Sequence, residues 1–317
     1  MITFENVTRI FGTWKAVDDV NLKVEPGELL VLIGPSGSGK STLLRMVNRL
    51  IEPTSGTIKL GNDNIASLQP EVLRRRIGYA IQSVGLFPHW TVERNIATVP
   101  TLLGWSKEAI AKRVEELLVL LQLDPARYRK AFPHELSGGQ AQRVGVARAL
   151  AGNPEVLLMD EPFGALDPIT RAALQAETLR IQRQLGKTIL FVTHDMDEAL
   201  RLGTRIVVLD QGKPVRIGTP AEIVADPGHA LVTELLGGES LGLRRLSIET
   251  VASRLRKGEK AKGTAIAATA PLGEALARML SESVGTLPVR DEAGKALGAV
   301  HLSDFPRTLK PKKAVKA

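Results

Sequence analysis

The chain has no cysteine, and aromatic residues make up only 4% of its 317 residues. Without cysteine it forms neither disulfide bonds nor thiolate metal sites, which fits a reducing compartment. No apolar run approaches the roughly 18 residues that a membrane-spanning helix requires, so we expect any membrane role to come through a partner. Residues 1–5 lack the basic start and the long apolar stretch of a secretory signal.

The rest of the composition is that of an ordinary globular protein, with 44% hydrophobic and 24% charged residues. The length allows roughly two domains. The net charge of +8 can indicate a nucleic acid or an anionic membrane surface as a partner. However, much of the excess lies in a lysine-rich C-terminal tail, so we predict no DNA-binding face and no nucleic-acid partner.

Residues 34–41 fit the pattern of a phosphate-binding loop (P-loop), G-x-x-x-x-G-K-[ST]. An apolar run at residues 29–33 precedes the loop, and good helix formers follow it at residues 42–47. Backbone N–H groups of such a loop and the helix N-terminus favour a phosphate. We therefore predict a nucleoside triphosphate site in which Lys40 reaches the β- and γ-phosphates and Ser41 ligates Mg²⁺. The predicted nucleotide-binding residues here are Gly34, Pro35, Ser36, Gly37, Ser38, Gly39, Lys40, Ser41 and Thr42.

Two later apolar runs, each with the length of a buried strand, end in polar residues. Residues 156–159 lead to Asp160, which suits a Mg²⁺ role, and to Glu161, which can act as general base on a water. The second run leads to His194, at the strand end where α/β sheets bind ligands. Acidic residues at strand ends often only cap the next element. Here, however, the P-loop already requires an acidic residue that binds Mg²⁺, which favours the functional interpretation of Asp160.

Several weaker signals accompany these motifs. Residues 137–140 place small residues at a helix start, which fits a second anion site or a simple N-capped helix. Phe11 is the better candidate and Trp14 the weaker one for stacking on a nucleotide base, and both also suit plain packing. Gln82 closes a strand-like run, and residues 83–92 form an apolar loop that is either tucked under a helix or offered to a partner. Residues 106–123 predict an amphipathic helix.

In this order the motifs resemble those of the ATP-binding cassette (ABC) ATPases, over about residues 1–238. The resemblance rests on the P-loop, Gln82, the signature at residues 136–140, Asp160 with Glu161, residues 164–167, and His194. It implies an α/β P-loop NTPase fold, which has a RecA-like core with an antiparallel β-subdomain and a helical subdomain, here at about residues 86–150. It also implies ATP and Mg²⁺ as ligands and ATP hydrolysis as the activity.

The resemblance further implies a homodimer in which each ATP lies between one P-loop and the signature loop of the partner. Closure of such a dimer replaces water around the γ-phosphate with fixed donors. The resemblance implies that the signature residues Ser137, Gly138, Gly139 and Gln140 contact the phosphate in trans. It implies that Glu161 polarises the attacking water and that His194 holds the γ-phosphate. Gln82 would link Mg²⁺ to the partner-facing loop, and Asp167 would communicate across the dimer.

Residues 48–56 and 79–89 resemble more narrowly the ATPase subunits of osmoprotectant importers, which carry glycine betaine, choline, carnitine or related quaternary ammonium compounds. This implies a membrane permease docking near residues 83–92, an indirect link to a substrate-binding protein, and a peripheral location at the cytoplasmic face of the inner membrane. An importer for another small solute, such as an amino acid or a metal, remains an alternative. A permease-free soluble ABC ATPase is disfavoured, because the chain has one cassette and no long coiled-coil insertion.

The C-terminal part begins with a predicted linker at residues 237–245. Residues 246–305 resemble a single cystathionine-β-synthase-type (CBS) motif, in which Asp304 matches the ribose-binding acid and His301 stands at the usual hydroxyl position. Because a ligand-binding unit normally needs two copies, we expect a structural or dimer-pairing role ahead of nucleotide binding. The basic tail, residues 306–317, is expected to be solvated or attracted to anionic lipid.

Overall fold

The computed structural model describes residues 1–81, 85–164, 166–237 and 241–305. The chain divides into two compact units, residues 1–217 and 218–317. The predicted end of the ABC ATPase domain at residue 238 and the predicted start of the CBS-like domain at residue 246 stay predictions. No helix in the described ranges is both long enough and apolar enough to cross a membrane.

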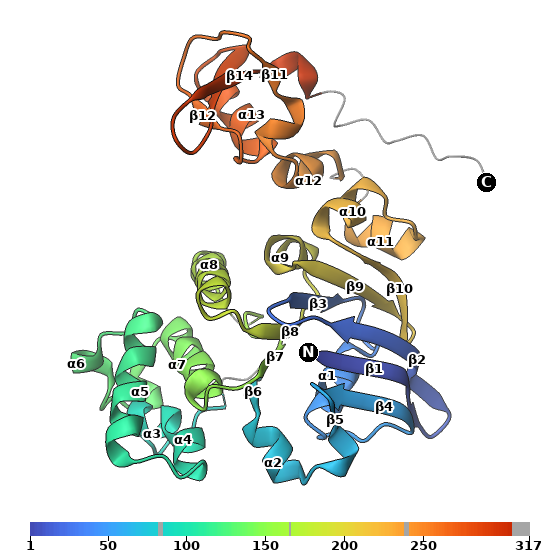
Figure 1. Cartoon of the computed structure of the whole chain (residues 1–317), viewed down its shortest axis with the longest axis vertical. Coiled ribbons are helices and arrows are strands. Elements are labelled where there is room, and N and C mark those ends of the chain that lie inside the picture. The colour runs from blue at the N-terminus through green and yellow to red at the C-terminus, as the bar shows by residue number, and fades with distance from the viewer. Residues whose placement is uncertain (82–84, 165, 238–240, 306–317) are drawn as a thin grey trace. The chain divides into compact units, whose positions relative to one another are not determined.

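The first unit contains two sheets, which Figure 1 shows in cartoon form. The smaller sheet has the strand order β2-β1-β4-β5, and the larger has the order β10-β9-β3-β8-β7-β6. From β9 to β6, neighbouring strands are parallel. The strands of the two sheets are β1 (Ile2–Phe11), β2 (Trp14–Val24), β3 (Leu29–Ile33), β4 (Ser55–Leu60), β5 (Asp63–Asn64), β6 (Ile77–Ala80), β7 (Val156–Asp160), β8 (Thr188–Val192), β9 (Arg205–Asp210) and β10 (Lys213–Gly218).

The register of the parallel sheet brings the predicted motifs to one edge. Strands β3, β7 and β8 are buried along their whole length, as expected for parallel strands covered on both faces. Val192 pairs with Leu32 on one side and with Asp160 on the other. The residues that follow these three strands therefore meet at the carboxyl edge of the sheet, where α/β sheets bind ligands. The predicted α/β P-loop fold is confirmed.

Helices α3 to α7 of the first unit form a group that lies apart from the antiparallel sheet (Figure 1). Within it, Ser106 caps α5 by accepting a hydrogen bond from the N–H of Ala109, which confirms the predicted helix start. The helices are α1 (Lys40–Val47), α2 (Pro70–Arg75), α3 (Val92–Ile96), α4 (Thr98–Leu102), α5 (Lys107–Leu120), α6 (Pro125–Tyr128), α7 (Gly138–Ala151), α8 (Pro168–Leu185) and α9 (Met196–Leu202).

The second unit has its own apolar core and a sheet of order β11-β14-β13-β12. The prediction of a linker at residues 237–245 was wrong from residue 241 onward, because helix α12 begins there and its Leu246 is buried in that core. The elements are α10 (Pro220–Ala225), α11 (Ala230–Leu235), α12 (Leu241–Ile248), β11 (Arg256–Lys257), β12 (Ile266–Ala267), α13 (Leu272–Ser281), β13 (Thr286–Arg290) and β14 (Ala296–His301).

Candidate functional site

The P-loop connects β3 to α1, and its backbone requires glycine at two positions. Gly34 and Gly39 have φ values of 154° and 98°. A Cβ on Gly34 would lie 2.1 Å from the carbonyl oxygen of Leu209, and one on Gly39 would lie 2.2 Å from that of Ala16. Larger residues are thus excluded by space as well as by backbone conformation. This close packing fixes the turn that leads into the N-terminus of α1.

Lys40 points back into the loop, and the residue is only 6% exposed. Its Nζ donates hydrogen bonds of 2.8 Å to the carbonyl oxygens of Gly34 and Pro35. Burial lowers the pKa of Lys40, and the charges of Glu161 and Asp160 oppose this effect. A cation among backbone N–H groups at a helix start fits a phosphate chain. Of the other loop residues, Pro35, Ser36 and Gly37 are exposed, Ser38 is buried, and Ser41 and Thr42 are half-buried.

Asp160 ends β7 next to the P-loop helix and is almost fully buried. Its Oδ1 accepts a hydrogen bond of 2.9 Å from Ser41, and its Oδ2 accepts one of 3.1 Å from Arg45 and one of 3.4 Å from Tyr79. Within the described residues, no group of three or more His, Cys, Asp or Glu side chains could hold a metal. A hydroxyl and a carboxylate oxygen still suit Mg²⁺, which takes further ligands from substrate phosphates and water.

Glu161 and His194 face each other at the same sheet edge. His194 Nδ1 lies 3.2 Å from Glu161 Oε2, and Glu161 has a φ of 46°. For a non-glycine residue this left-handed conformation costs free energy, and such strain is concentrated at functional sites. A cavity of about 30 Å³ lies against both residues and is otherwise lined by Phe163, Gly164, Arg171, Thr193, Asp195 and Glu198. It is large enough and polar enough to hold a water molecule.

The signature residues begin α7. Ser137 accepts a hydrogen bond from the N–H of Gln140, and the Gln140 side chain accepts one of 2.9 Å from the N–H of Ser137. This reciprocal capping box satisfies the backbone N–H groups of Ser137 and Gln140 at the start of the helix. In Figure 1, α7 lies with α3 to α6 and apart from α1. The structure therefore does not bring Ser137, Gly138, Gly139 and Gln140 to the P-loop of their own chain.

Asp167 caps α8, because its Oδ1 accepts hydrogen bonds from the N–H groups of Ile169 and Thr170. The Thr170 side chain is the main cause of a lowered pKa at Asp167. Gln82 lies outside the described residues, as do residues 83 and 84 of the predicted docking loop. In the rest of that loop, Phe87 is exposed and its ring centroid lies 4.4 Å from that of Trp90.

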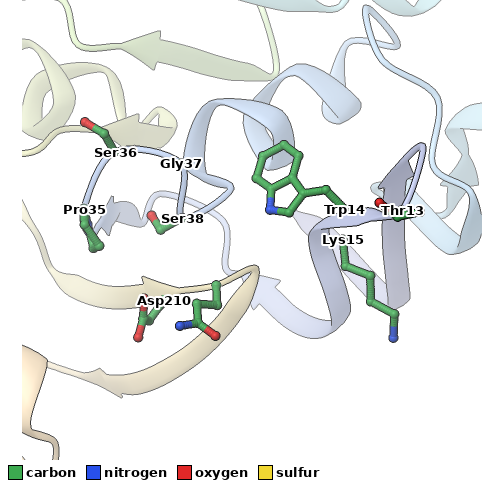
Figure 2. A pocket seen from close by; sticks show the side chains of 9 residues that line it. Thr13, Trp14, Lys15, Pro35, Ser36, Gly37, Ser38 and Asp210 are labelled. Carbon is green, nitrogen blue, oxygen red and sulfur yellow. The ribbon is translucent and has the colours of Figure 1, made fainter.

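A cavity of about 560 Å³ opens beside the P-loop (Figure 2). Figure 2 shows Trp14 across from the loop, and Phe11 is absent from the lining. Phe11 instead stacks on Trp14, with ring centroids 6.2 Å apart, and lies under the Arg9 guanidinium. Asp210 and Gln211 also line the cavity, and sequence reasoning missed both. Only the pairing of β9 with β3 could have pointed to them. The lining residues are Thr13, Trp14, Lys15, Pro35, Ser36, Gly37, Ser38, Asp210 and Gln211.

In the second unit, both carboxylate oxygens of Asp304 bind the Arg256 guanidinium, at 3.0 and 2.8 Å. This contact holds the pKa of Asp304 below its usual value. His301 Nε2 lies 3.0 Å from a carboxylate oxygen of Glu259. A polar cavity of about 440 Å³ touches Arg256 and Asp304. The predicted ribose-binding acid is thus engaged by a cation of its own unit.

Comparison with known proteins places these features in context. A family model described as "ABC transporter" matches residues 17–164. The glycine betaine uptake system ATP-binding protein YehX of Escherichia coli K12 is 51% identical, over 96% of this chain and 99% of its own length. The glycine betaine/carnitine/choline transport ATP-binding protein OpuCA of Bacillus subtilis is 47% identical, over 95% of this chain and 78% of its own length.

Solved structures agree with this likeness. The ATP-binding cassette MJ0796, solved as a dimer bound to ADP and phosphate, matches with a TM-score of 0.62 and 35% identity, over 69% of this chain and 99% of that one. CbiO1 of Clostridium perfringens, part of the transporter complex cbiONQ, matches with a TM-score of 0.67 and 27% identity, over 76% of this chain and 97% of that one.

Proposed function

Because the chain belongs to the ATP-binding proteins of ABC transporters, we propose that it is the energy-coupling ATPase of an importer for glycine betaine or a related quaternary ammonium osmoprotectant. The observation that carries the solute class is the extent of the likeness. Several relatives named for glycine betaine, carnitine, choline or osmoprotectant transport match 95–96% of the chain, so their likeness includes most of the second unit, although the glycine betaine/carnitine transport protein GbuA of Listeria monocytogenes matches only 71%.

Importers for another small solute form the second candidate. The spermidine/putrescine import ATP-binding protein PotA of Nitrosomonas europaea is 45% identical, but over 78% of this chain. Its identity is close to that of OpuCA, so identity alone does not separate the two solute classes. The match to a large part of the second unit favours the osmoprotectant class.

In the proposed reaction, Lys40 and the backbone N–H groups of the P-loop hold the β- and γ-phosphates of ATP. The Lys40 Nζ would exchange its bonds to the carbonyl oxygens of Gly34 and Pro35 for phosphate oxygens. Ser41, Asp160 and Gln82 would hold Mg²⁺. When bound, this ion neutralises charge that develops on the phosphates. Trp14, which lines the cavity beside the P-loop, would stack on the base in place of Phe11, the residue that the sequence favours.

Glu161 would accept a proton from the attacking water. The cavity beside it has room for that water, and His194 lies 3.2 Å from its carboxylate. His194 is largely exposed, so it can also contact the γ-phosphate. Positioned general bases contribute about 10²–10⁴-fold to rate, which sets the loss expected when Glu161 is neutralised.

The ATP sandwich of a homodimer would complete the site. Ser137 and Gly139 begin a helix that lies apart from α1 in the same chain, so a second chain would supply them (Figure 1). The dimer of the related cassette MJ0796 supports this arrangement. Asp167, at the start of α8, would communicate between the two ATP sites of the dimer.

Residues 83–92 would dock a coupling helix of the membrane permease, in a helix-in-groove mode. The exposed Phe87 and the half-buried Trp90 support this role. A substrate-binding protein would act on this chain only through the permease, and the chain would lie peripherally at the cytoplasmic face of the inner membrane. The CBS-like unit would then serve structure or dimer pairing, since Arg256 engages Asp304.

Uptake of labelled glycine betaine tests this function in cells of the source organism that carry Glu161→Gln on the chromosome. We expect uptake to be lost, with choline and carnitine as unlabelled competitors to narrow the solute. Glu71→Gln makes the same neutralisation at an exposed position of α2 and should leave uptake unchanged. Uptake that is unchanged in the Glu161 variant but lost when the gene is deleted would refute the role of Glu161, and uptake that also survives the deletion, in cells with no second glycine betaine importer, would refute the proposed solute class.

A further inference from the structure

Asn95 of α3 is fully buried behind residues 85–91, yet its side chain makes four hydrogen bonds to main-chain atoms. Its Oδ1 accepts from the N–H of Phe87 at 2.8 Å. Its Nδ2 donates to the carbonyl oxygens of Phe87, Trp90 and Thr91 at 3.1–3.2 Å. A carboxamide supplies an acceptor and donors at once, which a carboxylate or an apolar side chain of the same size does not.

These bonds fix a segment that has no helix or strand of its own. Residues 85–91 present Phe87, which is 44% exposed, and Trp90, which lies beneath the Arg94 guanidinium at 4.2 Å. Aromatic side chains beside an arginine are enriched among the residues that dominate protein interfaces. Because Asn95 bonds both Phe87 and Trp90, it sets the position of the two rings relative to α3.

The same segment is tied to the signature helix. Arg148 of α7 donates a hydrogen bond of 2.6 Å to the carbonyl oxygen of Gly85, and α3 packs against α7. Burial lowers the pKa of Arg148, but a guanidinium stays charged in proteins. The segment is thus held at Gly85 by α7 and from Phe87 to Thr91 by α3.

We propose that Asn95 is a positioning residue that joins residues 85–91, α3 and α7 into one rigid body. A permease helix that displaces Phe87 and Trp90 then displaces the start of α7, and with it Ser137 and Gly139 of the ATP sandwich. Without Asn95 the segment would deform and absorb the displacement. This inference rests on the proposed permease contact.

Amide hydrogen exchange of the isolated protein tests the clamp directly. In the wild type, the Phe87 amide should exchange at least about tenfold more slowly than a free peptide, because Asn95 accepts its proton. Asn95→Leu, which supplies no acceptor, should remove most of that protection, whereas Asn95→Asp keeps an acceptor for the Phe87 N–H and loses only the donors to the three carbonyl oxygens. Exchange of the wild-type Phe87 amide at the free-peptide rate would overturn the clamp without any variant.

The coupling role is tested by ATP turnover of the isolated protein and of proteoliposomes that contain it with the permease co-purifying with the wild type. Asn95→Asp should leave the isolated activity within about twofold and lower the permease-dependent increase at least about tenfold. An equal loss of both activities, or no loss, would overturn the positioning role.

Asn153→Asp is the matched control. It makes the same change of charge at an exposed residue, whose side-chain oxygen accepts a hydrogen bond from Lys187 that aspartate can retain. Both activities should stay at the wild-type level. If wild-type turnover does not respond to the permease, the proposed docking fails, and the coupling inference fails with it even where exchange shows the clamp.

Discussion

Among single residues, we predict that Glu198 lowers the free energy of unfolding at neutral pH. It is 6% exposed, and its Oε1 accepts a hydrogen bond of 2.9 Å from Gln175. Burial raises its pKa above the ordinary value of 4.5. The folded state therefore keeps this proton to a higher pH than the unfolded chain does, and the free energy of unfolding falls as pH rises from about 4.5 through the folded-state pKa. We predict that Glu198→Gln removes this fall.

Urea unfolding of the nucleotide-free protein at several pH values measures the effect. The variant should be more stable than the wild type at pH 7, and the difference should shrink toward zero near pH 4. The exposed control Glu71→Gln should show no such trend. A Glu198→Gln variant whose advantage grows on acidification would show that the carboxylate is stabilised, not destabilised, by its surroundings.

How far the sequence predicts a site residue depends on what fixes its position. Lys40 and Gly34 lie six residues apart in one loop, so their spacing alone determines the geometry. Asp160 and His194 depend only on the ends of buried parallel strands, which apolar runs mark well. The choice between Phe11 and Trp14 depends instead on the irregular pairing of β1 with β2, whose register shifts near residues 9 and 10, and no local pattern records such shifts.

Between elements, α7 and α8 approach so closely that one glycine cannot be replaced without a shift. A Cβ on Gly139 would lie 2.5 Å from Thr170 Cγ2, whereas one on Gly138 would lie 3.8 Å from Leu166 Cδ2. We predict that Gly139→Ala lowers the free energy of unfolding by about 1–3 kcal/mol, as overpacking does. Gly138→Ala should change it by less than about 0.5 kcal/mol. Urea unfolding of both variants measures the difference.

The cause of that loss can be isolated with Thr170→Ser. This substitution removes Cγ2 and keeps the hydroxyl group that lowers the pKa of Asp167. In the Gly139→Ala background it should restore most of the lost stability, with a coupling energy of at least about 0.5 kcal/mol between the two positions. Additive effects of the two substitutions would mean that the added methyl group strains some other contact.

For the whole chain, the sequence predicts the cassette better than the second unit. The cassette motifs occur in a fixed order, and each adjoins a strand or helix that its own apolar pattern marks. Residues 241–245 contain one glycine, two arginines and only two leucines, so their pattern predicts a linker although they begin α12. Their helix is stabilised by packing of Leu246 in a core whose other members lie beyond residue 250.

The association of two chains can be tested with hydrolysis removed. Since α7 lies apart from α1 within one chain, a closed site needs a partner, and Glu161→Gln should trap that pair when ATP and Mg²⁺ are present (Figure 1). Light scattering should then show twice the mass of the 34.2 kDa chain, while ADP leaves the single mass. Adding Lys40→Ala should abolish pairing, because the phosphates lose their cation. A single mass in saturating ATP, or a doubled mass without nucleotide, would contradict the ATP sandwich.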